Sequence, residues 1–80
     1  MKNNQLLKKV IKDLVGQGLD KSLFRTCRKS TGPDIKLYYD GVYLNKLCPT
    51  KTAHQRFDNS FRACIEKVLK DRLGLEVKLR

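Results

Sequence analysis

The fold is decided by residues 35–47, which read IKLYYDGVYLNKL. Residues 35–39 alternate, with Ile35, Leu37 and Tyr39 on one face and Lys36 and Tyr38 on the other, and a period of two is typical of a β-strand. A second strand-like run follows the Asp40-Gly41 pair. Both turn positions of a two-residue hairpin need positive φ, which Asp-Gly pairs adopt readily. We therefore predict strands at residues 35–39 and 42–47, joined by a tight turn.

Two further elements are predicted before this hairpin. Residues 22–29 favour a first strand, because they combine apolar, aromatic and β-branched side chains that suit a pleated surface. Residues 30–34 read Ser-Thr-Gly-Pro-Asp, which is typical of a turn. Residues 3–16 carry apolar side chains at helical spacing, so we predict an amphipathic helix there. We expect Asn3 or Asn4 to cap its first turn.

A second helix is predicted after the hairpin. Residues 52–73 again place apolar side chains at helical spacing, with Thr50 or Thr52 expected as the cap and Gly74 at the C-terminal end. In the last six residues, 75–80, apolar side chains alternate with charged ones. This pattern allows a short fourth strand, either added to an edge of the sheet or offered as an edge to a partner.

These elements predict an α+β fold. Residues 1–80 are expected to form one two-layer domain in the order α-β-β-β-α, with a possible short C-terminal strand. An antiparallel sheet packed by two helices on one face buries both apolar helix stripes. The other sheet face then stays open to solvent or to a ligand.

Charge is the unusual feature of the composition. Eighteen Lys and Arg stand against eight Asp and Glu, for a net charge of +10, and the two halves of the chain share this excess equally. No basic tail is attached to a neutral domain. A surface with this charge attracts anions, which favours a polyanionic partner such as DNA or RNA.

The cysteines and the apolar pattern indicate the compartment. Cys27, Cys48 and Cys64 make an odd count, which argues against a secreted disulfide framework, and Cys27 and Cys64 are interpreted as small core residues. No apolar run approaches the roughly 20 residues that span a membrane, and no signal peptide is visible. We expect a cytoplasmic protein that makes no membrane contact.

The candidate phosphate-binding residues are basic side chains predicted on the sheet, its turns and the second helix. Lysine and arginine beside hydroxyl groups and backbone N–H groups are typical of phosphate contacts. The candidates are Lys21, Arg25, Arg28, Lys29, Lys36, Lys51, Arg56, Lys67 and Lys70.

Two tyrosines are candidates for base stacking. Tyr38 is expected to face away from the apolar side of its strand, and Tyr43 to lie across the hairpin from it. An exposed tyrosine pair beside Lys36 offers flat faces to unpaired bases. The alternative interpretation is ordinary cross-strand packing that stabilises the hairpin.

Catalytic and metal chemistry are not indicated. The cysteines lack the short Cys-x₂₋₄-Cys spacing of structural zinc sites. His54 is the single histidine, with no orienting group evident beside it, and the acidic residues are scattered. No glycine-rich phosphate loop is present. We predict no catalytic residue, no metal and no cofactor.

The predicted order with a basic surface resembles double-stranded-RNA-binding-type folds, which include the small HicA-type toxins. The resemblance is one of topology. HicA-type toxins carry a Gly-Ser-His element on a strand with a catalytic histidine, whereas the comparable stretch of this chain, residues 28–32, reads Arg-Lys-Ser-Thr-Gly. No family residues carry over, and ribonuclease activity is not expected.

The sequence therefore favours a small, non-enzymatic nucleic-acid-binding domain of low sequence specificity. The alternative is a small basic inhibitor or adaptor, of the type used by phages and mobile elements, that docks on an acidic surface of a host protein or nucleoprotein complex. Electrostatic attraction serves both roles. In the second, the alternating C-terminal residues and the tyrosines become contact sites.

Overall fold

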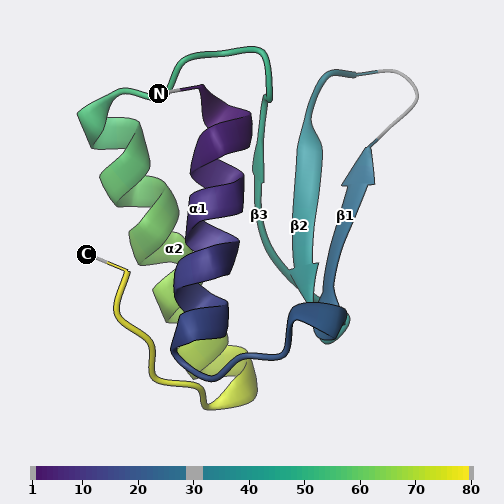
Figure 1. The fold of residues 1–80 in the computed structure, drawn as a ribbon, viewed down its shortest axis with the longest axis vertical. Coiled ribbons are helices and arrows are strands. Elements are labelled where there is room, and N and C mark those ends of the chain that lie inside the picture. Colours follow the sequence, from purple (N-terminus) through teal and green to yellow (C-terminus); the bar gives the residue numbers. More distant parts are fainter. Residues whose placement is uncertain (1, 29–31, 80) are drawn as a thin grey trace.

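The chain folds in the element order that the sequence predicts (Figure 1). In this computed structural model, residues 2–28 and 32–79 are described. The elements are α1 (Asn3–Gly16), the short 3₁₀ helix η1 (Lys21–Leu23), β1 (Phe24–Arg28), β2 (Ile35–Tyr39), β3 (Val42–Leu47) and α2 (Gln55–Leu73). The α+β class is confirmed, and α1, β2 and β3 have the predicted bounds.

The three strands form one antiparallel sheet in the order β1-β2-β3. Asp40 and Gly41 join β2 to β3 with φ values of 51° and 77°, the left-handed torsions that this hairpin turn requires. Residue 29 of the predicted first strand and residues 30–31 of the predicted turn lie outside the described residues. The predicted first strand begins too early, because the Asp20 side chain accepts a hydrogen bond from the Ser22 N–H at 2.9 Å and starts η1 there.

A β-bulge in β3 decides which of its side chains face the helices. The pairing register between β2 and β3 shifts after Leu37, which makes Leu44 the extra residue of β3. The bulge reverses the in-and-out alternation from that point. Leu44 and Leu47 are therefore both buried although they are three residues apart, while Tyr43 is 44% exposed. Without the bulge, strict alternation would turn Leu47 to the opposite face.

The core lies between the sheet and the two helices. Its most buried members come from all three parts and include Leu37, Leu44, Val10, Leu14 and Ile65, each at most 1% exposed. Each such side chain stabilises the fold by about 1.5–3 kcal/mol. Both helices therefore pack on one face of the sheet, as predicted, and the opposite face stays outside the core.

The helix caps differ from the prediction. The N-cap position of α1 is occupied by Lys2, whose side chain makes no cap hydrogen bond, and both expected caps, Asn3 and Asn4, lie within the helix. Asn3 is buried, and its amide nitrogen donates to the Cys48 carbonyl oxygen at 2.8 Å. Neither threonine caps α2. That helix starts at Gln55, and the N-cap is His54, whose Nδ1 accepts a hydrogen bond from the Phe57 N–H at 3.0 Å.

The C-terminal end of α2 matches the prediction. Gly74 follows the helix with φ 67°, and its N–H donates to the Lys70 carbonyl oxygen at 3.1 Å. A left-handed residue at this place ends a helix and redirects the chain. In the described part of the chain, no helix is long and apolar enough to cross a membrane.

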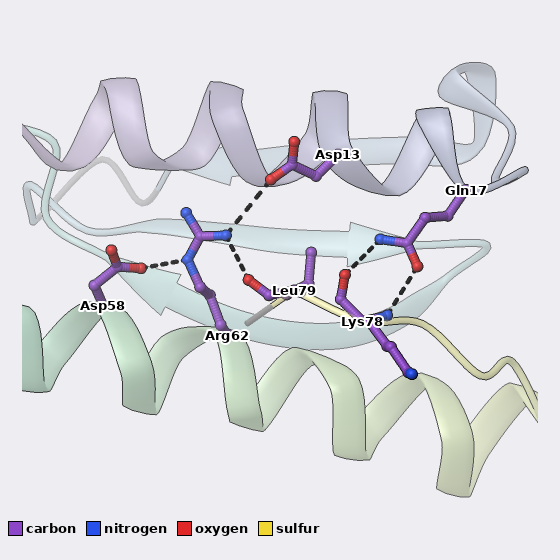
Figure 2. Close-up of polar contacts among 6 residues, drawn as sticks. All are labelled: Asp13, Gln17, Asp58, Arg62, Lys78 and Leu79. Carbon is purple, nitrogen blue, oxygen red and sulfur yellow. Dashed lines mark hydrogen bonds and ion pairs between the residues drawn. The ribbon is translucent and has the colours of Figure 1, made fainter.

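The last described residues, 75–79, do not form the fourth strand that the alternation allowed. They run back between the two helices, on the side away from the sheet (Figures 1 and 2). Gln17 holds them as a neighbouring strand would: its Nε2 donates to the Lys78 carbonyl oxygen at 2.6 Å, and its Oε1 accepts from the Lys78 N–H at 2.8 Å. Leu79 is only 6% exposed. The segment therefore packs against the helices and adds no strand to the edge of the sheet.

Candidate functional site

The sheet face turned away from the helices carries an ordered set of side chains. Arg25 of β1 pairs with Tyr38 of β2, and Tyr38 pairs with Tyr43 of β3. Directly paired residues of an antiparallel sheet project from the same face, with Cβ atoms about 5 Å apart. The first row across this face is therefore one guanidinium group followed by two phenol rings.

A second row lies two residues along the strands. Cys27 of β1 pairs with Lys36 of β2, and Lys36 pairs with Lys46 of β3. Cys27 and Lys46 are exposed, and Lys36 is half-buried. The two rows define what we call the open face: Arg25, Tyr38, Tyr43, Cys27, Lys36 and Lys46.

The charge of the strands has one sign. The three strands read FRTCR, IKLYY and VYLNKL, so all four charged residues within them are basic and none is acidic. Three of these, Arg25, Lys36 and Lys46, lie on the open face, and Arg28 ends β1. The nearest acidic residues in the sequence, Asp34 and Asp40, belong to the turns.

The two tyrosines of the open face contact one another. Their ring centroids are 5.6 Å apart with an interplanar angle of 55°, and the Lys36 Nζ lies 5.9 Å from the Tyr43 ring centroid. Burial, with smaller contributions from Cys64, Tyr38 and Asp34, raises the pKa of the Tyr43 hydroxyl above its ordinary value. The phenol therefore stays neutral near pH 7 and adds no negative charge to this face.

Arg25 is held in place by η1 and by its own strand. Its Nη1 donates to the carbonyl oxygens of Ser22 at 3.0 Å and Phe24 at 3.3 Å. These bonds use one of the two terminal nitrogens of the guanidinium, which carries five N–H donors in total. The remaining donors of a fixed guanidinium group can bind an anion with a smaller entropy cost than a fully mobile side chain.

Further candidate residues lie near the end of the sheet where α2 begins. Arg28, the last residue of β1, pairs with Ile35, which pairs with buried Leu47, so Arg28 projects from the helix side of the sheet and not from the open face. Lys51 lies in the turn before α2, and Arg56 in its first helical turn; both are exposed. Lys51 also lines a small cleft together with Lys46 of the open face and with Asp34. Two cations, Lys51 and Arg56, therefore lie beyond this end of the open face, with one carboxylate between them and Lys46.

This cleft also contains a thiol and an unsatisfied acceptor. A hydrogen bond with the Thr50 hydroxyl, at 3.2 Å from the Sγ, holds the pKa of the Cys48 thiol below its ordinary value, and backbone hydrogen bonding adds to the effect. Buried Asn3, which lines the cleft, leaves its Oδ1 without a hydrogen-bond partner. His54 lies here as the cap of α2.

Lys67 and Lys70 do not join the open face. They line a groove between α2 and the C-terminal segment, where Glu66, Asp71 and Glu76 also lie. Cations and carboxylates are mixed in this groove, so its net potential is weak. Lys21 lies in η1, before the opposite end of β1, and Lys29 lies outside the described residues.

Two interpretations of the cysteines are wrong. Cys27 and Cys64 are exposed rather than part of the core. Cys27 alternates to the open face of β1, a strand in which only Phe24 is buried. Cys64 lies at the edge of the α2 stripe, where its Sγ donates weakly to the Leu44 carbonyl oxygen at 3.6 Å. Among residues 2–28 and 32–79, no three His, Cys, Asp or Glu residues gather as a metal site would require.

Lys46 is the cation of the open face that sequence reasoning missed. If side chains alternated strictly from Tyr43 onward, Lys46 would point to the helices and Leu47 to solvent. The Leu44–Leu47 spacing was the available signal, because two leucines three apart both reach the core only if the strand contains an extra residue.

No protein-family model, curated protein or solved structure matches this chain.

Proposed function

We propose that the chain is a small, non-enzymatic nucleic-acid-binding domain that contacts phosphates through its open face. The observation that carries the proposal is that Arg25, Lys36 and Lys46 share one sheet face with two tyrosines, and that the strands contain no acidic residue. A protein with a net charge of +10 concentrates polyanions around itself. The open face gives them a place to dock.

The dimensions of the open face suit a phosphate chain. Neighbouring strands lie about 4.8 Å apart, so the three cations extend over about 10 Å across the sheet. Lys36 and Lys46 are direct cross-strand neighbours, and like charges at this distance repel each other. A bound phosphate relieves that repulsion by placing a negative charge between the two ammonium groups.

The side-chain types favour low sequence specificity. Lysine ammonium groups bind phosphate as point charges, whereas base reading relies mainly on fixed donors and acceptors aimed at base edges. Lys51 and Arg56, at the adjoining end of the sheet, extend the contact along the same backbone. About five phosphates are then neutralised, by Arg25, Lys36, Lys46, Lys51 and Arg56.

The test is the salt dependence of binding, measured with single- and double-stranded oligonucleotides. For about five phosphate contacts, log K should fall with log salt at a slope near −4. The double variant Lys36→Gln/Lys46→Gln should weaken binding and make the slope shallower by about 1.5–2. The matched control Lys67→Gln/Lys70→Gln removes the same charge from the mixed groove and should leave the slope close to that of the wild type.

Two results would contradict the proposal. A flat salt response of the wild type means that no phosphates are neutralised. Equal losses in the two double variants mean that overall charge, and not the open face, attracts the polyanion. Stoichiometric retention of one protein partner after nuclease treatment, with no affinity for oligonucleotides, would instead favour the inhibitor or adaptor function.

A further inference from the structure

We infer that the open face selects unpaired, single-stranded nucleic acid, with Tyr43 as the platform on which a base stacks. This inference rests on the proposed nucleic-acid binding and adds the class of strand. It is carried by the position of Tyr43 among the cations, by its exposure and by the support that its ring receives.

Tyr43 is the ring offered to solvent. It is 44% exposed, whereas Tyr39 on the opposite sheet face is 6% exposed. Tyr38 packs beside the Tyr43 ring at 5.6 Å between centroids and limits its rotation. A rigid aromatic ring that is already partly desolvated loses little entropy when a base covers it, and such stacking contributes appreciably to single-strand binding.

The cations around Tyr43 fit a backbone that passes beside a stacked base. The Lys36 Nζ lies 5.9 Å from the Tyr43 ring centroid, and Lys46 is the cross-strand neighbour of Lys36. A base on the ring therefore places its own phosphate within reach of two ammonium groups. Arg25, at the other end of the tyrosine row, reaches a phosphate one or two nucleotides away.

A duplex cannot use this ring. Its bases are stacked on one another inside the helix, and a stacking contact with Tyr43 requires a base to leave the stack at a cost of a few kcal/mol. A duplex can still contact the cations through its phosphates.

The open face measures about 10 Å across the strands and about 7 Å along them between the two rows. This area accommodates two or three nucleotides of a single strand, at about 3.4 Å per stacked nucleotide.

The experiment compares two variants on two probes at one salt concentration. The probes are a single-stranded oligo-thymidylate of about 12 nucleotides, which covers a small-domain site, and a duplex of the same length. Tyr43→Leu keeps an apolar side chain against Tyr38 but removes the aromatic face. Tyr43→Phe keeps the ring and removes the hydroxyl. Unfolding curves of both variants establish that each is folded at the temperature of the titrations.

The inference predicts a selective loss. Tyr43→Leu should weaken single-strand binding by about 5- to 100-fold, the range for one stacked base, and leave duplex binding within about twofold. Tyr43→Phe should bind both probes like the wild type. Quenching of tyrosine fluorescence should accompany single-strand binding by the wild type and should be reduced in Tyr43→Phe.

The experiment distinguishes failure of the proposed nucleic-acid binding from failure of the single-strand inference. If the wild type binds neither probe, the proposed function itself is wrong. If the wild type binds both probes with the expected salt slope but Tyr43→Leu loses nothing, or loses equally on both, phosphate binding stands and the single-strand inference is overturned. A preference of the wild type for the duplex overturns it as well.

Discussion

The Arg62 guanidinium group donates to the Leu79 carbonyl oxygen at 2.8 Å, which ties α2 to the last described residue of the chain (Figure 2). The same side chain, 9% exposed, also makes ion pairs with Asp58 one turn earlier and with Asp13 of α1 at 3.5 Å. One cation therefore links both helices and the C-terminal segment. Its position on the side of the helices away from the sheet separates this role from the open face.

Replacing Arg62 should destabilise the fold strongly. Arg62→Ala leaves two carboxylates and a carbonyl oxygen without their donor, and we expect a loss of about 2–4 kcal/mol in the free energy of unfolding. Urea denaturation measures this change. Arg56→Ala, at an exposed position of the same helix, is the control and should cost less than about 0.5 kcal/mol. Equal effects of the two variants would show that the Arg62 contacts contribute nothing.

The C-terminal segment should contribute to stability through both its backbone and its side chains. Gln17→Ala removes two hydrogen bonds to Lys78 and should cost about 1 kcal/mol. Leu79→Ala removes a buried side chain and should cost about 2–3 kcal/mol. Gln5→Ala replaces an exposed glutamine of the same helix and serves as the control. A wild-type midpoint for Leu79→Ala in chemical denaturation would mean that the segment does not pack on the helices in solution.

Two glycines should respond to alanine with opposite signs. Gly41 has φ 77°, so Gly41→Ala places a side chain in the left-handed region and should cost about 1–2 kcal/mol. Gly16 ends α1 without a positive φ and has no atom within 4 Å of an added Cβ. Gly16→Ala should therefore stabilise the protein by about 0.5 kcal/mol. Thermal unfolding of both variants checks the pair, and a change of the same sign in both would contradict the turn geometry.

Cys48 should react faster than an ordinary thiol. The Thr50 hydrogen bond lowers the pKa of the Cys48 thiol, so a larger fraction is thiolate near pH 7. In a variant that keeps Cys48 alone, the pH midpoint of iodoacetamide alkylation should lie below that of a free cysteine. Thr50→Val removes the donor and should move the midpoint upward. An unchanged midpoint in Thr50→Val would rule out this cause.

The sequence was sufficient where local patterns determine structure. The Asp40-Gly41 turn, the strands on either side and the two helices follow from alternation, helical spacing and turn torsions. Tyr38 and Tyr43 were placed across the hairpin for the same reason, and they do pair. These features depend on residues close in sequence, which is why composition and spacing alone predict them.

The features that were missed depend on contacts between distant residues. Arg62 is buried because α1 and a segment 17 residues away along the chain both pack against it. Lys46 reaches the open face because of the bulge in β3, which shows in the sequence only as the spacing of Leu44 and Leu47. Cys27 is exposed because it lies on the sheet face turned away from the helices. Tertiary packing decides each of these cases.

Protection of Cys27 is the most direct test of the central claim, because this thiol lies on the open face beside Lys36. In a Cys48→Ser/Cys64→Ser background, a saturating oligonucleotide should slow Cys27 alkylation several-fold. In a cysteine-free background, Asp71→Cys reports on the groove beyond the helices and should keep its rate. The account predicts protection of Cys27 alone; unchanged Cys27 alkylation while the oligonucleotide is bound would place the nucleic acid elsewhere and contradict it.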